Sequence, residues 1–114
     1  MPRRRAGQLL PLEEDILRIG IDRAASSEPE FHGFGAAEAL GEAGLGGRLL
    51  GHGTLYKALG RLEDQGLLES RWEDVDPSEV GRPRRRLYRV TGAAAPALTA
   101  SELSRSAQGR VVTA

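Results

Sequence analysis

The chain has 114 residues, a hydrophobic fraction of 39%, no cysteine and a formal net charge of zero. This length holds one domain core but not two, and the apolar content and charge balance exclude wholesale disorder. The missing cysteines exclude disulfides and thiolate metal sites. The apolar runs are too short to cross a bilayer, and the segment after the arginines at 3–5 is too short for a signal peptide. We expect a soluble, cytoplasmic protein.

Charged residues in the second half of the chain occur in blocks of one sign. Acidic side chains gather between 73 and 79, and five arginines follow between 82 and 89. Such blocks favour one locally positive surface in the folded protein. A charge run alone is more often a solvated face than a binding site, so these arginines do not by themselves indicate a partner.

The N-terminal half predicts two helices behind a mobile basic arm at 1–8. Pro11 suits the first position of a helix, because its missing N–H has no acceptor there. Apolar side chains at helical spacing follow as far as about Ala24. A second helix is expected from Gly33 to Ala43, and the glycines at 44–47 end it.

The sequence GTLYKALGRLEDQG at 53–66 carries the strongest helical pattern. Leu55, Leu59 and Leu62 follow the i, i+4, i+7 spacing of one helix face, and Gly66 provides a stop. We predict that these leucines are buried and that they orient the helix.

The opposite face of this third helix has side chains that are typical of a DNA recognition helix. Lys57 and Arg61 are expected to project one turn apart, where either can donate to guanine N7 and O6. The hydroxyls of Thr54 and Tyr56 are placed to hold phosphates. An ordinary amphipathic helix with a solvated polar face explains the same pattern equally well.

After Gly66 the period changes to two, which predicts strands at 67–73 and 85–90. Turn residues at 76–78 and 81–83 join them into an antiparallel hairpin. Three helices followed by a hairpin is the order of a winged helix-turn-helix. The predicted fold is therefore mainly α with a small β-hairpin: three helices, a two-stranded wing and a short C-terminal helix.

The arginines of the hairpin would flank a DNA groove if the hairpin is an exposed wing. The acidic residues on its leading side either neutralise these arginines or keep non-specific affinity low. Trp72 on the first strand is expected in the core or at a hinge rather than stacked on an aromatic effector. The arginines concerned are Arg82, Arg84, Arg85, Arg86 and Arg89.

The tail predicts only a short helix. Pro96 would remove a backbone hydrogen bond from the interior of any helix capped by Thr91. The sequence from Thr99 to Glu102 fits a capping box, which favours a helix over 100–108. We assign 9–91 to a DNA-binding domain and 92–114 to a dimerisation helix and tail.

Three segments together resemble a known family: HGF at 32–34, GTLYKALGRLEDQGLLESRWE at 53–73 and GRPRRRLYRVT at 81–91. They are similar, in this order, to the PadR family of bacterial transcriptional regulators. The similarity extends from about Leu12 to Thr91 and is most specific in the third helix and the wing.

The resemblance implies a winged-helix repressor that dimerises through a C-terminal helix. It also implies release of DNA when a small effector binds, often a phenolic or cationic drug-like compound. By position, Tyr56, Lys57 and the arginines between 81 and 86 match DNA-contacting places. Ala94 stands where the family usually has glycine, and Pro96 interrupts what is normally a continuous dimer helix.

No pattern in the sequence supports catalysis or a cofactor. His32 and His52 lie twenty residues apart without metal-ligand spacing, so a metal site is not expected. His32 is expected to pack or hydrogen-bond at the start of the second helix. No set of nucleophile, base and acid and no phosphate loop has the required spacing.

We expect a homodimer that binds double-stranded DNA at an inverted repeat, with a small-molecule effector and no membrane association. Trp72 and Leu103 are candidate effector or dimer contacts. The competing interpretation is a winged helix that binds a partner protein, which the zero net charge favours. A regulator whose sensing partner is another chain is a third alternative.

Overall fold

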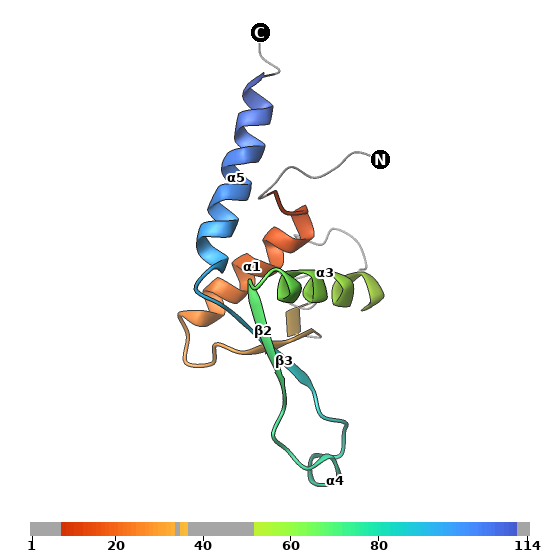
Figure 1. Ribbon diagram of the computed structural model, residues 1–114. Coiled ribbons are helices and arrows are strands. Elements are labelled where there is room, and N and C mark those ends of the chain that lie inside the picture. Colours follow the sequence, from red (N-terminus) through yellow and green to blue (C-terminus); the bar gives the residue numbers. More distant parts are fainter. Residues whose placement is uncertain (1–7, 34, 37–51, 112–114) are drawn as a thin grey trace.

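The computed structural model describes residues 8–33, 35–36 and 52–111. Strands β1, β3 and β2 form, in that order, one antiparallel sheet. The molecule measures 62 × 30 × 28 Å, because α5 and the β2–β3 hairpin extend toward opposite ends (Figure 1). The elements are α1 (Pro11–Ala24), β1 (Phe31–His32), α3 (His52–Asp64), β2 (Leu68–Trp72), α4 (Pro77–Val80), β3 (Arg86–Val90) and α5 (Ala94–Val111).

Helix α1 begins and ends where the sequence predicted. Pro11 occupies the first turn, and the Glu13 carboxylate accepts the backbone N–H of Leu10 at 2.9 Å. Ile16 and Leu17 are fully buried. A β-carbon at Gly20 would lie 2.5 Å from the Val90 side chain, so α1 crosses the sheet closely at this glycine.

The sheet has one strand more than the predicted two-stranded wing. The predicted hairpin strands are confirmed at 68–72 and 86–90, but Phe31 and His32 form β1 and pair with Tyr88 and Leu87 of β3. The rings of Phe31 and Tyr88 lie 6.1 Å apart. Two residues are too short a segment for a period-two pattern, so the sequence did not show this strand.

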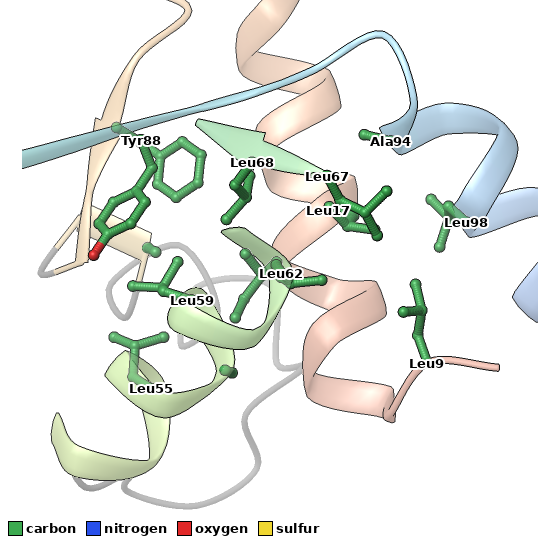
Figure 2. Packing of buried hydrophobic residues seen from close by; sticks show 14 residues of the cluster. Leu9, Leu17, Leu55, Leu59, Leu62, Leu67, Leu68, Tyr88, Ala94 and Leu98 are labelled. Carbon is green, nitrogen blue, oxygen red and sulfur yellow. The ribbon is translucent and has the colours of Figure 1, made fainter. Parts of the chain in front are cut away.

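The hydrophobic core lies between α1, α3, the sheet and the start of α5 (Figure 2). Leu55, Leu59 and Leu62 are buried, which confirms the predicted leucine face of α3. Leu68 of β2 packs in the same cluster, and Leu98 joins it from α5. This packing turns the opposite face of α3 outward.

Helix α5 corrects the prediction of a short helix over 100–108. The helix is continuous from Ala94, and Pro96 lies in its first turn, where a backbone N–H has no intrahelical acceptor. Thr91 supports the start, because its Oγ1 accepts the N–H of Ala93 at 3.3 Å. Pro96 therefore sits where proline is tolerated and does not interrupt the helix.

The loop between β2 and β3 contains a one-turn helix where the sequence indicated only turns. Asp76 caps α4 by accepting the N–H of Ser78 at 2.9 Å, and Gly81 ends it with φ 71°. The loop is thus held in a defined shape.

Several predictions fall on residues that the structure does not describe. These are most of the basic arm, most of the predicted second helix and the glycines at 44–47. Gly33, Gly35 and Ala36 are helical, as the predicted second helix requires. In the described part of the chain, no helix has the length and apolar character needed to cross a membrane.

Candidate nucleic-acid interface

The first turns of α3 present polar side chains to solvent. Thr54 and Lys57 are exposed, and Tyr56 is 46% exposed, while Leu55 between them is buried. These three side chains lie on the outward face that the leucine spacing predicted.

Tyr56 is held in place by its contact with Gly33. A β-carbon built on Gly33 would lie 2.8 Å from both Cζ and Oη of Tyr56, which is closer than van der Waals contact allows. The phenol ring therefore rests directly on the backbone at Gly33. The glycine of the HGF sequence has a packing reason that spacing did not reveal.

Arg61 does not project beside Lys57, so its predicted outward orientation is wrong. Its Nε donates to Oε2 of Glu13 at 2.7 Å, and the Glu13 side chain is fully buried. Arg61 lies at the border between the leucine face and the polar face, within reach of α1. A buried carboxylate is costly without a charged partner, which favours this inward pairing.

The base of the wing is organised around the carboxylate of Glu73. Arg82 donates to both of its oxygens, at 2.7 and 3.0 Å, and the backbone N–H of Arg85 donates to Oε1 at 3.2 Å. The hydrogen bonds from Arg82 lower the pKa of Glu73 to about 2. The guanidinium of Arg82 thus shapes the loop rather than standing free.

Arg86 is also engaged inside the protein. Its guanidinium carbon lies 5.1 Å from the centre of the Trp72 ring, and its Nη2 lies 3.8 Å from Oε2 of Glu63 on α3. The same Glu63 oxygen accepts the hydroxyl of Ser70 on β2. These contacts connect the β2–β3 hairpin to α3 through Glu63.

Trp72 is 59% exposed, so its expected core position is wrong. Leu68, Ser70 and Trp72 do share one face of β2, as predicted, and Leu68 is buried there. The exposure increases along the strand toward the wing. The predicted alternation of β2 is therefore correct, but the hydrophobic core ends before it reaches Trp72.

Two wing arginines and one lysine carry charge without a carboxylate partner in the described part of the chain. Arg84 donates to the carbonyl of Val75 at 2.8 Å, and among the described residues neither Arg85 nor Lys57 forms an ion pair through its side chain. Arg84, Arg85 and Tyr56 line one hollow of about 440 Å³ between α3 and the wing.

The outer face of the sheet has a different character, because its arginines are neutralised. Arg89 donates to Glu69 on the neighbouring strand at 2.9 Å. Arg71 donates to both oxygens of Glu30, at 2.6 and 2.7 Å, and these bonds lower the pKa of Glu30. Excess positive charge is therefore not spread evenly over the hairpin.

A second buried carboxylate ties α5 to α1. Ser101 donates to Oε2 of the fully buried Glu14 at 2.7 Å and accepts the N–H of Leu9 at 2.8 Å. Arg105 of α5 forms an ion pair with the other Glu14 oxygen. Leu103 on the same helix is 65% exposed.

His32 lies at the edge of this surface, where it lines the hollow between α3 and the wing. No group of three or more potential metal ligands occurs among the described residues. His32 accepts the N–H of Gly35 at 3.1 Å through Nδ1, which confirms its expected hydrogen-bonding role at the start of the second helix.

The packed helices, the hairpin and the cationic hollow between them define a winged-helix protein. A family model described as the transcriptional regulator PadR-like family matches residues 24–100. The chain therefore belongs to the PadR-like family of transcriptional regulators and is not an enzyme. Family membership confirms both the resemblance and the predicted fold class.

Solved structures share this fold over most of the chain. A transcriptional regulator from Clostridium thermocellum is 19% identical with a TM-score of 0.68, covering 89% of this chain and 85% of that one. A PadR-like transcription factor from Bacteroides fragilis is 26% identical with a TM-score of 0.64, again covering 89% and 85%.

The structure of Bacillus subtilis PadR in complex with operator DNA is also similar. It is 18% identical, has a TM-score of 0.58, and the match covers 77% of this chain and 44% of that one. At this identity the likeness shows a common fold only. No curated protein matches the sequence significantly.

Proposed function

We propose that this chain is a sequence-specific DNA-binding regulator whose α3 enters a major groove while the wing lies along the adjacent backbone. One observation carries the proposal: Tyr56 of α3 lines the same hollow as Arg84 and Arg85 of the wing, two arginines without a carboxylate partner among the described residues. The phosphates of DNA supply the negative counter-charge that these arginines lack within the protein. A fold neighbour solved with operator DNA supports the same reading.

The contacts within the protein divide the predicted site residues into two groups. Lys57 is assigned to base edges, and Thr54 and Tyr56 to phosphates, because all three are exposed on α3. Arg84 and Arg85 are assigned to the backbone or the minor groove. We assign Arg61, Arg82 and Arg86 to holding α3 and the wing in position, because their guanidinium groups are already engaged.

We further propose a homodimer formed through α5, acting in the cytoplasm as a repressor that a small molecule relieves. Helix α5 extends away from the wing and exposes Leu103, which supports a contact between protomers at that end (Figure 1). Two copies would place their recognition helices in half-sites of an inverted repeat, roughly 34–36 Å apart.

The assignment of Lys57 is tested by Lys57→Ala in binding titrations with duplexes of the region upstream of its own coding sequence. A lost base contact weakens binding by about 1–3 kcal/mol and relaxes the preference at one base position. Arg71→Ala is the matched control, because Arg71 is paired with Glu30 on the outer face of the sheet. Equal weakening on all sequences would show that Lys57 contacts phosphate.

A partner-protein module is the second candidate function, favoured by zero net charge and by exposed acids on the wing. Asp74 and Glu79 are both exposed there. A chain of this class would fail to shift any duplex at moderate salt. It would also be insensitive to Lys57→Ala.

A further inference from the structure

The position of Trp72 suggests a role beyond the residues assigned so far. It follows Leu68 and Ser70 on the face of β2 that is turned toward α3. Leu68 is buried beneath that helix, and Ser70 reaches Glu63 on it. Trp72 continues the same row beyond the core, so its ring stands on the side of the wing that faces the recognition helix.

The ring is exposed, but it is held by its neighbour across the strands. Trp72 pairs with Arg86 in the sheet register, and the Arg86 guanidinium lies over the indole. Arg86 is in turn 3.8 Å from Glu63 of α3. An aromatic ring that is oriented in advance loses little conformational entropy when a partner binds. An exposed ring that is held in this way is well suited to contact a partner.

Two adjoining hollows meet at this ring. The first, of about 440 Å³, is shared with Tyr56 and Arg85, and the second, of about 830 Å³, is lined by Trp72, Pro77, Pro83 and Arg84. Each hollow thus combines rigid apolar surface with a guanidinium that has no carboxylate partner among the described residues. A nucleic-acid strand has the complementary pattern, because its sugars present apolar faces between successive anionic phosphates.

We propose that Trp72 is a DNA-contacting residue whose indole packs against a deoxyribose of the strand that passes between α3 and the wing. Arg84 and Arg85 neutralise the phosphates on either side of that sugar. The inference rests on the proposed function and deepens it, because it adds an apolar contact to a surface so far described by its charges.

Trp72 is the only tryptophan of the chain, so its fluorescence reports on this contact directly. The full chain is titrated with the duplex from upstream of its coding sequence while the tryptophan emission is recorded. In parallel, the anisotropy of a fluorescein-labelled copy of the duplex is measured. We expect the emission to change along the same saturation curve as the anisotropy.

Substitutions of Trp72 test the contribution of the ring to binding while Arg84 and Arg85 stay in place. Trp72→Ala is expected to weaken duplex binding about tenfold, and Trp72→Phe much less, in line with aromatic contacts to nucleic acids. Val80→Ala is the matched control, because Val80 is an exposed hydrophobic residue of the same wing that lines neither hollow. Thermal unfolding of each variant confirms that the fold is retained.

The outcomes distinguish this inference from the function on which it rests. Duplex binding with unchanged tryptophan emission, and with wild-type affinity in Trp72→Ala, overturns the contact and leaves the DNA-binding function standing. Absence of binding to any duplex overturns both. A change in solution mass of Trp72→Ala with unchanged affinity overturns the contact and assigns the ring to a second copy. Quenching by a phenolic compound with unchanged affinity assigns the ring to an effector.

Discussion

The wing and the N-terminal turn of α1 both use pairs of glutamate and arginine, but in opposite surroundings. In the wing, the side chains of Glu73 and Arg82 are 18% and 31% exposed, and those of Glu69 and Arg89 are about half exposed. In α1, Glu13 and Glu14 are fully buried, and arginines of two other helices reach them. The same chemistry therefore shapes a solvent-facing hairpin in one region and joins three helices in the other.

This difference shows which contacts set the geometry of the proposed DNA-binding surface. Exposed ion pairs contribute little free energy because water and salt screen them. Breaking a pair that contains a buried charge is much more costly. Glu13 holds α3 through Arg61, and the adjacent Glu14 holds α5 through Ser101 and Arg105. One turn of α1 thus fixes both the recognition helix and the proposed dimer helix.

The largest expected effect is on stability, from Arg61→Ala. Removing the guanidinium beside buried Glu13 is expected to lower the free energy of unfolding by about 2–3 kcal/mol, less than for a fully buried pair because Arg61 is partly exposed. Arg71→Ala removes an arginine from an exposed pair, which water and salt screen, and is expected to lower the free energy of unfolding far less. Urea unfolding of both variants makes the comparison, and equal losses would contradict it.

The next largest effect is expected from Gly33→Ala, and it is on duplex binding more than on stability. Gly33→Ala forces the Tyr56 ring away from its present place, so duplex binding is expected to weaken by about 1 kcal/mol, the size of one lost hydrogen bond. Gly60→Ala is the control, since a β-carbon there meets no atom within 4 Å. The control variant should gain up to about 1 kcal/mol of stability from helix propensity.

Both variants are compared by duplex-binding titration and by thermal unfolding. Unchanged affinity in Gly33→Ala would show that the position of Tyr56 is unimportant for binding. A loss of affinity in Gly60→Ala would instead show that DNA approaches the backbone of α3 at that glycine.

Local patterns in the sequence were sufficient to predict α3 and β2. The leucine spacing of α3 and the alternation of β2 identified both elements and the faces they bury. The same patterns failed at Arg61 and Trp72, because each lies at the edge of a buried face and its neighbours come from distant segments. Glu13 and Glu14 lie in the first turn of α1, where acids are common, and no local signal in the sequence shows that residues of two other helices contact them.

The tail and β1 were missed for different physical reasons. Pro96 disrupts a helix interior but not a first turn, so the prediction depended on a helix start that the sequence did not fix. Strand β1 forms because Phe31 pairs and packs with Tyr88 of β3. The two residues lie in segments that are far apart in the chain, so no local pattern indicates this contact.

The central claim, that the wing neutralises DNA phosphates with Arg84 and Arg85, is tested most directly by the salt dependence of duplex binding. The double variant Arg84→Ala with Arg85→Ala is compared with the charge-matched pair Arg71→Ala with Arg89→Ala, whose arginines are neutralised on the outer face. The wing variant should show a shallower dependence of log affinity on log salt, by about one to two units per protomer. An unchanged slope in the wing variant, or an equal change in the outer-face variant, would contradict the account.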